Sequence, residues 1–372
     1  MNDKNKRSVI CIGAGPACLT AARKLASEGV DVTVLERDPE YVGGHRFFSK
    51  SAEIEALWDE ILGDQLITRP RKSRIYYNHK LFDYPLRAFD ALSKLGLFES
   101  ARCIASHAKS RMFPIRDPQT FEEWVTNEFG HRLYSIFFET YTEKVWGMKC
   151  HEISADWAAQ RIKGLSLGGA VRGALKPEWM KNRKGNGVKA KTLIESFRYP
   201  KLGPGQMWEA AAEQIRAMGG TVRLGASVNG LEYDTATGKW TVHAADTRGV
   251  SEEFECDEVI SSSAIGDLAS YLNPAPPEEV LAAAHALRYR DFLTVALIIR
   301  DIDCFDDNWI YIHDSTVKVG RIQNFKSWSP HLVPDPDLNC LGLEYFCFSG
   351  DGLWESDDDA LIRLADEELI QL

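Results

Sequence analysis

The spacing of hydrophobic residues changes twice within the first 36 positions of the chain. Residues 9–12 form a continuous apolar run, which is typical of a buried parallel strand. Apolar side chains then recur every three or four positions over residues 19–26, as one face of a helix requires. Gly29 ends that helix, and residues 31–35 predict a second short strand. The pattern therefore predicts a strand–helix–strand unit.

The turn between the first strand and the helix has the residues of a dinucleotide site. Gly13 permits a tight turn, and Gly15 lets the backbone approach a pyrophosphate at the helix start. Glu36 follows the second strand, where an acidic side chain can hold a ribose. Cys18 replaces the third glycine of the pattern, and we expect slight crowding there. The nucleotide-binding residues predicted here are Gly13, Ala14, Gly15, Pro16, Ala17 and Glu36. The alternative is a turn that is glycine-rich for packing alone.

Later segments also change between helical and strand patterns. Ser51 and Thr120 are predicted helix N-caps, and Glu123 completes a capping box with Thr120. The other predicted elements are helices over residues 87–113, 207–218 and from Ser356, and strands over residues 221–224, 289–300, 309–314, 319–325 and 341–348. On the strand at 319–325, alternation places Arg321 and Ile322 on opposite faces.

Residues 69–86 concentrate basic and aromatic side chains in a predicted hairpin, with Asn78 near its turn. One interpretation is a solvated amphipathic ribbon. The other is the wall of a pocket for an anionic substrate. Composition alone favours the ribbon.

Composition limits the classes of function. The 372 residues are enough for two domains. The net charge of −10 argues against non-specific nucleic-acid binding. No apolar run reaches 18 residues and none precedes the first strand, so we expect neither a membrane span nor a secretion signal. The eight cysteines are scattered without a CxxC pair, which predicts reduced thiols, no metal site and a cytoplasmic location.

A second glycine pair, Gly43 and Gly44, follows the first unit, and His45 comes directly after it. With this pair, the first fifty residues resemble the amine-oxidase and UDP-galactopyranose mutase group of FAD proteins, which includes protoporphyrinogen-oxidase-like NAD(P)/FAD-dependent oxidoreductases. The resemblance implies FAD as the cofactor, held also by Arg37, Gly43 and Gly44, with His45 beside the flavin. Two glycine motifs of the group look merged here, which implies an internal deletion between Gly43 and His45.

Residues 141–147, YTEKVWG, are similar to the YTEKQWG-type motif of the mutases. The resemblance implies that Tyr141, Trp146 and Trp157 line a substrate pocket, where aromatic faces suit a uracil or sugar ring. Without the resemblance, we would interpret the segment as a structural helix pair with buried tryptophans and a surface charge cluster of Glu143 and Lys144.

The resemblance also assigns roles to later positions. Arg161 and Arg321 would clamp a substrate diphosphate, because guanidinium groups suit bidentate phosphate contacts. Together with His45 they are the catalytic candidates. Gly205 and the backbone near Val228 would meet the FAD, and Glu344 and Tyr345 are further pocket candidates.

The implied fold is α/β, with a Rossmann-like FAD/NAD(P)-binding domain of the glutathione-reductase-2 type and an inserted helical plus antiparallel-sheet substrate domain. We expect the FAD domain at residues 1–50 and 191–270, a mainly helical substrate domain at 51–190, and a β-sheet substrate region with a C-terminal helix at 271–372. The group normally continues with another glycine-bearing segment, so the resemblance implies a C-terminal truncation after Leu372.

Three functions are compatible with these observations. The first is a mutase-like enzyme that uses reduced FAD on a small-molecule substrate such as a UDP-sugar, with NAD(P)H as a candidate reductant. The second is an FAD-dependent oxidase or dehydrogenase of an amine or polyene-type substrate. The third is a non-catalytic remnant with weak nucleotide binding. NAD remains an alternative dinucleotide, since Glu36 suits any adenosine ribose.

Overall fold

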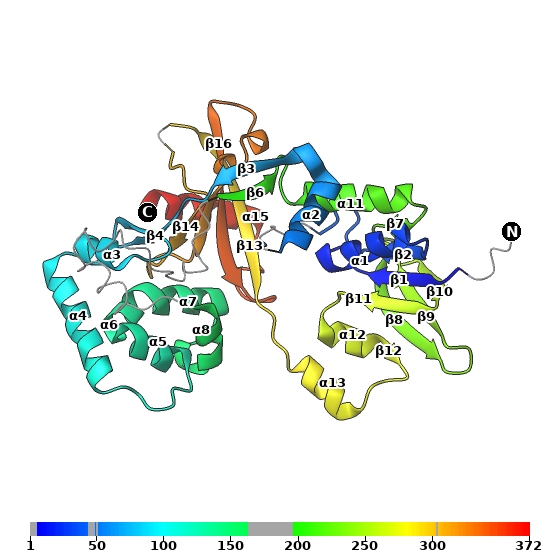
Figure 1. Cartoon of the computed structure of the whole chain (residues 1–372), viewed down its shortest axis with the longest axis horizontal. Helices are drawn as coiled ribbons and strands as arrows, with labels where there is room; N and C mark the ends of the chain where they lie inside the picture. Colours follow the sequence, from blue (N-terminus) through cyan, green and yellow to red (C-terminus); the bar gives the residue numbers. More distant parts are fainter. Residues whose placement is uncertain (1–5, 44–48, 50, 163–195, 303) are drawn as a thin grey trace. The chain divides into compact units, whose positions relative to one another are not determined.

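The computed structural model describes residues 6–43, 49, 51–162, 196–302 and 304–372. The chain divides into two compact units (Figure 1). Unit 1 comprises Met1–Thr68 with Arg198–Arg288, and unit 2 comprises Arg69–Phe197 with Tyr289–Leu372. The chain passes between the units three times: within β3 (Leu66–Pro70), within β6 (Ser196–Pro200) and between Arg288 and Tyr289. Strands β3 and β6 pair as a two-stranded sheet. Of the expected helical region, residues 51–68 belong to unit 1 and the rest to unit 2. Of the expected β-sheet region, residues 271–288 belong to unit 1 and the rest to unit 2.

Unit 1 is built on two four-stranded sheets. One is parallel, with strand order β11-β1-β2-β7, and the other has the order β10-β9-β8-β12. The strands are β1 (Ser8–Ile12), β2 (Asp31–Leu35), β7 (Thr221–Arg223), β8 (Ser227–Asp234), β9 (Lys239–Ala245), β10 (Ser251–Cys256), β11 (Glu258–Ser261) and β12 (Leu272–Asn273). The helices are α1 (Pro16–Ser27), α2 (Ala52–Leu62), the 3-10 helix η1 (Gly63–Gln65), α11 (Gly205–Ala217), α12 (Ile265–Tyr271) and α13 (Glu278–His285). The strand–helix–strand prediction is confirmed as β1–α1–β2.

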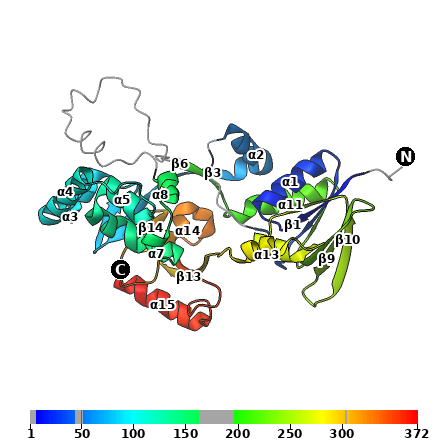
Figure 2. The same cartoon turned by 90° about the horizontal axis from the view of Figure 1, so that it is seen from below.

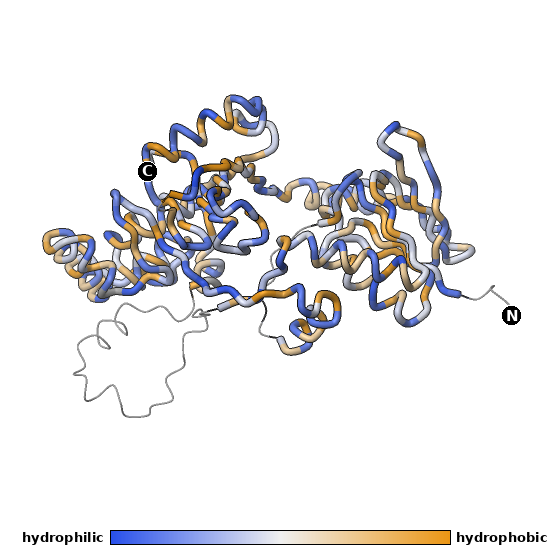
Figure 3. Tube along the Cα trace, turned by 90° about the horizontal axis from the view of Figure 1, so that it is seen from above, coloured by the Kyte–Doolittle hydropathy of each residue, from blue (hydrophilic) through white to orange (hydrophobic). Residues whose placement is uncertain are grey.

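The parallel sheet of unit 1 is buried on both faces, because alternate side chains of each strand enter different cores. Val9 and Cys11 of β1 pack with α1, α2 and α11, whereas Ile10 and Ile12 pack with β8 and β9 of the second sheet. This explains why β1 is continuously apolar in the sequence. The hydrophobic colouring along these central strands is visible in Figure 3.

Unit 2 contains a six-stranded mixed sheet of order β13-β16-β15-β14-β4-β5. Its strands are β4 (Ser73–Tyr77), β5 (Lys80–Asp83), β13 (Asp291–Arg300), β14 (Trp309–Ile312), β15 (Arg321–Asn324) and β16 (Leu338–Cys347). Strands β4 and β14 are parallel, and the other neighbours are antiparallel. The predicted hairpin at 69–86 is confirmed as β4–β5.

The helices of unit 2 lie mostly between β5 and β6 in sequence. They are α3 (Ala88–Leu95), α4 (Leu97–Met112), α5 (Phe121–Phe129), α6 (His131–Tyr134), a π-helix η2 (Ser135–Glu139), α7 (Thr140–Trp146), the 3-10 helix η3 (Cys150–Glu152) and α8 (Ala155–Arg161), followed later by α14 (Phe325–Trp328), the 3-10 helix η4 (Pro330–Leu332) and α15 (Asp358–Gln371). Gly96, with φ 88°, divides the single predicted helix over 87–113 into α3 and α4. In the part of the chain that the structure describes, no helix is long and apolar enough to cross a membrane.

The two faces of the unit 2 sheet differ in chemistry. Ile310, Ile322 and Leu343 point to a core that includes Ala365 of α15. Figure 2 shows α15 beside β13. Their strand neighbours point to the other face, so Arg321 lies opposite Ile322 as predicted. One face of the sheet therefore packs against the hydrophobic core with α15, and the other face carries polar side chains such as Arg321.

Two of the three expected helix caps are found at the predicted residues. Thr120 Oγ1 accepts the N–H of Glu123 at 3.2 Å and the Glu123 carboxylate returns the contact, so the capping box is confirmed. Ser51 is at the N-cap of α2 but makes no side-chain capping bond. At α15, Asp357 is the cap instead of Ser356, whose hydroxyl donates to the Gly352 carbonyl.

Candidate functional site

The first candidate site is the turn between β1 and α1 in unit 1. Gly13 has φ 98°, a region that side chains disfavour, and its N–H donates to the Leu35 carbonyl at 2.8 Å. A Cβ at Gly13 would lie 2.5 Å from Ser262 Oγ. The Ser262 hydroxyl itself donates to the Ile12 carbonyl at 3.0 Å. Glycine is therefore required by both conformation and packing, and Ser262 is a site residue that the sequence analysis missed.

Gly15 differs from Gly13 because nothing in the described chain occupies its side-chain position. It is the N-cap of α1 with φ −81°, and a Cβ there would have no heavy atom within 4 Å. Pro16 begins the helix and Ala17 follows in the first turn, whose N–H groups lack intrahelical acceptors. Open space in front of a helix N-terminus is suited to an anionic group.

Gly43 packs directly on this turn. Its N–H donates to the Ala14 carbonyl at 2.9 Å, and a Cβ at Gly43 would lie 2.9 Å from Gly15 Cα. Two backbone segments 28 positions apart in the sequence therefore meet without side chains between them. Gly44 and His45 lie outside the described residues.

Glu36 connects β2 to the same turn. Its carboxylate accepts the N–H of Ala14 at 2.6 Å through Oε2 and the N–H of Asp38 at 3.0 Å through Oε1. Arg37 beside it is exposed. Glu36 thus orients the glycine turn, and each carboxylate oxygen retains capacity for another donor, such as a ribose hydroxyl.

The other predicted nucleotide contacts lie elsewhere in unit 1. Gly205 begins α11, and Val228 on β8 is 7% exposed, with its side chain in the core between the two sheets. The segment that leads to Val228 begins beside Glu36, since the Ala226 N–H donates to the Glu36 carbonyl at 2.7 Å. Cys18, at the third glycine position, is fully buried, and its thiol donates to the Ile12 carbonyl at 3.3 Å.

A second candidate site is on the polar face of the unit 2 sheet. Tyr311, Arg321 and Glu344 are direct cross-strand partners on β14, β15 and β16. Arg321 Nε donates to one oxygen of Glu344, and the Gln323 amide donates to the other. Arg321 makes no other hydrogen bond among the described residues, so its two Nη groups remain donors.

Three tyrosines surround this ion pair. Tyr141 of α7 packs edge-on against Tyr311 with ring centroids 5.2 Å apart, and Tyr84 lies 4.6 Å from the same ring. We call the set Tyr84, Tyr141, Tyr311, Arg321 and Glu344 the Arg321 cluster. Burial raises the pKa of Tyr141 and of Tyr311, so both hydroxyls stay protonated at neutral pH. The cluster therefore offers neutral hydroxyls and the outer edge of a guanidinium.

Arg321 and Glu344 form an ion pair in a largely buried position. Their side chains are 20% and 3% exposed. Burial acts to lower the pKa of Arg321, but the Glu344 carboxylate more than offsets it and the pKa is raised overall. The positive charge expected for a diphosphate clamp is thus already balanced by a carboxylate in this chain.

The other predicted substrate residues do not join the cluster. Trp146 and Trp157 pack on each other at 5.0 Å in the helical core of unit 2. Tyr345 is fully buried on the opposite face of β16, against α15, because its neighbour Glu344 takes the polar face. We therefore do not carry Tyr345 forward as a pocket residue. Arg161 ends α8, and its side chain lies outside the described structure.

Lys144 of the YTEKVWG segment is half-buried, and its ammonium is not part of a surface charge cluster. Its Nζ donates to the backbone carbonyls of Asp314 and Val319. Burial lowers the pKa of Lys144 to about 8, although the carboxylates of Glu368 and Asp314 act to raise it. His313, which stacks on Tyr141 at 4.9 Å, is buried, and burial together with the Lys144 charge lowers its pKa to about 3. Lys144 thus fastens α7 to the loop after β14.

Two family models match the chain. A model described as an NAD(P)-binding Rossmann-like domain matches residues 11–58. A model described as a flavin containing amine oxidoreductase matches residues 40–369, which is most of the chain. The two matches overlap at the segment that contains Gly43.

Curated proteins that match part of the chain include two mutases. A Klebsiella pneumoniae protein named "Probable UDP-galactopyranose mutase" is 25% identical over 177 residues, which are 42% of this chain and 44% of the relative. The dTDP-fucopyranose mutase of Escherichia coli is 28% identical over 169 residues, 40% of this chain and 44% of the relative. The chain thus spans less than half the length of these curated relatives.

A crystal structure of reduced UDP-galactopyranose mutase has the same fold. It superposes with a TM-score of 0.77 at 21% identity, covering 96% of this chain and 77% of the other. The mixed α/β fold with a Rossmann-like domain, expected from the sequence, is confirmed.

Removing one partner of the buried ion pair is expected to destabilise unit 2 strongly. Arg321→Met leaves the Glu344 charge buried without its cation, which costs about 3–5 kcal/mol of unfolding free energy in urea titrations. The double variant Arg321→Met/Glu344→Met should lose less than the sum of the two single variants. Arg223→Met, which breaks a pair whose side chains are 37% and 35% exposed, is the control and should cost about 1 kcal/mol or less. Equal losses of unfolding free energy in Arg321→Met and Arg223→Met would contradict the role of the Arg321–Glu344 pair as a buried ion pair.

Lys144 is expected to make stability rise with pH. Between about pH 8 and pH 10.5 the folded chain has released the Lys144 proton while the unfolded chain still binds it. The wild type should therefore gain up to about 3 kcal/mol of unfolding free energy over this interval relative to Lys144→Met. Urea titrations at fixed pH values measure the difference, with the exposed Lys149→Met as control. Parallel pH profiles for wild type and Lys144→Met would be the contrary result.

Proposed function

The chain belongs to the flavin containing amine oxidoreductase family, and from this premise we propose that it is an FAD-dependent enzyme acting on a nucleotide sugar. The observation that carries the cofactor assignment is the unequal packing of three glycines. Gly13 and Gly43 are tightly enclosed by protein, whereas Gly15 between them faces open space at the start of α1.

This arrangement fits a dinucleotide. The first-turn N–H groups of α1 would hold the pyrophosphate, and the absent side chain at Gly15 would let it approach the backbone. Glu36, already fixed by the Ala14 N–H, would accept a ribose hydroxyl. Arg37, Gly44, Gly205 and the backbone near Val228 remain proposed contacts, as does His45 beside the flavin. When bound, the flavin would supply the redox or nucleophilic chemistry, and the residues would bind and orient.

The nucleotide-sugar assignment is supported by the names of two curated relatives, which are nucleotide-sugar mutases, and by the YTEKVWG segment. In the Arg321 cluster, the hydroxyls of Tyr84, Tyr141 and Tyr311 would hydrogen-bond to a polyhydroxylated ring. The free Nη edge of Arg321 would donate to a hydroxyl or phosphate oxygen. Because Glu344 neutralises Arg321, we propose that Arg161 carries more of the diphosphate binding than Arg321 does. NAD(P)H is the proposed reductant.

A second candidate is favoured by the same ion pair. A cluster without surplus positive charge is also compatible with an uncharged or cationic substrate, and the family includes amine oxidoreductases. In that case a substrate amine would reduce the flavin and no sugar would isomerise.

The glycine assignment predicts a specific loss of cofactor. In Gly15→Ala the added methyl meets no atom of the described residues within 4 Å, so the melting temperature should not change. The methyl should instead obstruct the pyrophosphate and weaken FAD binding at least about tenfold. Visible absorbance after incubation with FAD and desalting measures retention, and Gly352→Ala, equally unobstructed but in unit 2, is the control. FAD retention equal to wild type in Gly15→Ala would overturn the assignment.

The substrate assignment is tested with FAD-loaded, dithionite-reduced protein and UDP-galactofuranose. Chromatography should show conversion to UDP-galactopyranose that requires both flavin and reduction. Flavin bleaching by an amine under anaerobic conditions, without sugar conversion, would replace the mutase assignment with the amine oxidase one.

A further inference from the structure

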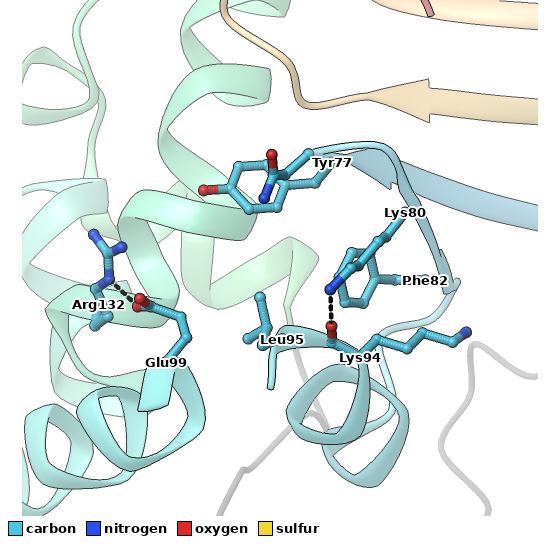
Figure 4. Close-up of a pocket in the computed structure, with 8 residues that line it drawn as sticks. Tyr77, Lys80, Phe82, Lys94, Leu95, Glu99 and Arg132 are labelled. Atoms are coloured by element: carbon cyan, nitrogen blue, oxygen red, sulfur yellow. Dashed lines mark hydrogen bonds and ion pairs between the residues drawn. The ribbon is translucent and has the colours of Figure 1, made fainter. Parts of the chain in front are cut away.

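A cavity of about 210 Å³ lies within unit 2, on the side of the hairpin turn. It is enclosed by the β4–β5 hairpin, the end of α3, the start of α4 and α6 (Figure 4). The lining residues are Tyr77, Asn78, Lys80, Phe82, Lys94, Leu95, Glu99 and Arg132. None of them belongs to the Arg321 cluster or to the glycine turn of unit 1. The cavity is smaller than the ~300–1,000 Å³ that hold drug-sized ligands, so it suits a small molecule.

The charge of the lining is opposite to that of the whole protein. Lys80, Lys94 and Arg132 face a single carboxylate, Glu99, in a chain whose net charge is −10. Lys94 pairs with Asp90, and Glu99 also accepts from Arg102 outside the cavity, so adding these neighbours leaves the same surplus of positive charge. A local excess of cations in an acidic protein favours an anionic ligand.

Arg132 is held in a fixed orientation by one hydrogen bond, while its two Nη groups are unused as donors among the described residues. Its Nε donates to Glu99, and no other hydrogen bond of its guanidinium occurs among the described residues. The Arg132 guanidinium lowers the pKa of Glu99, so the Glu99 carboxylate is charged and holds the guanidinium in place. The Nη edge is thus preorganised for a carboxylate or phosphate.

Lys80 and Tyr77 provide two further donors. Lys80 Nζ donates only to the Lys94 carbonyl at 2.8 Å, and no carboxylate of the described chain lies within 4 Å of it. The hydroxyl of Tyr77 makes no hydrogen bond to any described residue, and Figure 4 shows it pointing to the side of the cavity where Arg132 lies. These donors come from the hairpin, across the cavity from α6.

The rest of the lining is apolar and partly aromatic. The rings of Tyr77 and Phe82 and the side chain of Leu95 form the wall, and Lys94 Nζ lies 5.9 Å from the Phe82 ring centroid. A planar apolar body can rest on these surfaces while its anionic group reaches Arg132 and Lys80.

The hairpin turn that presents these residues is conformationally demanding. Asn78 and His79 both have positive φ, 49° and 55°, as in a type I′ turn, where glycine normally takes the second position. His79 is stabilised there by a 3.0 Å hydrogen bond between its Nδ1 and the Tyr76 hydroxyl. The turn brings the Asn78 carboxamide, which has no hydrogen-bond partner in the described structure, into the lining.

We propose that this cavity is a binding site for a small aromatic anion, with its carboxylate or phosphate held between Arg132 Nη, Lys80 Nζ and the Tyr77 hydroxyl. The site is independent of the proposed flavin chemistry, since it shares no residue with either of the two candidate functional sites. It also gives the basic and aromatic hairpin a role as the wall of an anion pocket.

Isothermal titration of the full chain without flavin tests the proposal with benzoate, phenyl phosphate and the neutral benzamide. We expect at least one anion to bind with a Kd on the order of 1 mM, as fits a ligand of this size. Benzamide should bind at least about tenfold more weakly than that anion. Lys80→Gln and Arg132→Gln should each weaken the anion about tenfold, and Tyr77→Phe should weaken it less. The preferred anion identifies the head group as carboxylate or phosphate.

Arg102→Gln is the matched control, because Arg102 contacts the same Glu99 but does not line the cavity. It should bind the anion as wild type does. Circular dichroism shows whether Arg132→Gln is folded. If it is unfolded, anion binding by Lys80→Gln and Tyr77→Phe, which leave the Glu99 ion pair intact, tests the proposal. Equal binding of benzamide and the anions, no binding of either anion, or equal losses in Arg102→Gln and Lys80→Gln would each overturn the proposal.

Discussion

The turn at Gly13 is the constraint on which unit 1 depends. Its positive φ lets β1 turn into α1, its N–H ties the turn to β2 through the Leu35 carbonyl, and its missing side chain admits Ser262 after β11. One glycine therefore joins three neighbouring strands and a helix. Glu36 and Gly43 then pack onto the same turn from later in the chain. These contacts fix the position of Gly15 and of the open space in front of it among the described residues.

Unit 2 depends on a different constraint, the alternation of side chains on its central strands. The face of β14, β15 and β16 that meets α15 is apolar, so polar residues concentrate on the other face. There Arg321 and Glu344 compensate each other's burial, and the tyrosines close around them. The result is a rigid polar surface with little net charge, unlike the cationic hairpin cavity of the same unit. Unit 2 thus has a nearly neutral polar face at the Arg321 cluster and a separate cationic cavity at the hairpin.

Local patterns in the sequence predicted the local structure well. The continuous apolar run of β1, the helical spacing of α1 and the capping box at Thr120 are all found, because each depends on residues close together in the chain. The face of Arg321 also followed from alternation alone. The break at Gly96 was missed, since the apolar spacing continues across it and only the backbone conformation reveals it.

Long-range partners could not be predicted in this way. Nothing near Arg321 in the sequence indicates that Glu344 neutralises it, and nothing near Gly13 indicates Ser262. Tyr345 was singled out for its residue type, but cross-strand register assigns the polar face to its neighbour. Lys144 looked like a surface charge because its carbonyl partners are about 170 positions away. Electrostatic roles of this kind become visible only when the strands are paired.

The π-helix η2 has a consequence for how Tyr141 reaches the sheet. A π-helical turn accommodates one residue more than an α-helical turn, and each residue of an α-helix advances the side-chain direction by about 100°. The segment Ser135–Glu139 therefore acts as a phase shift between α6, which packs in the helical core, and α7, which presents Tyr141 to Tyr311. Loss of a single residue here could preserve helicity throughout and yet turn Tyr141 away from the sheet. Helix phase, not helix content, is the property that this part of the chain maintains.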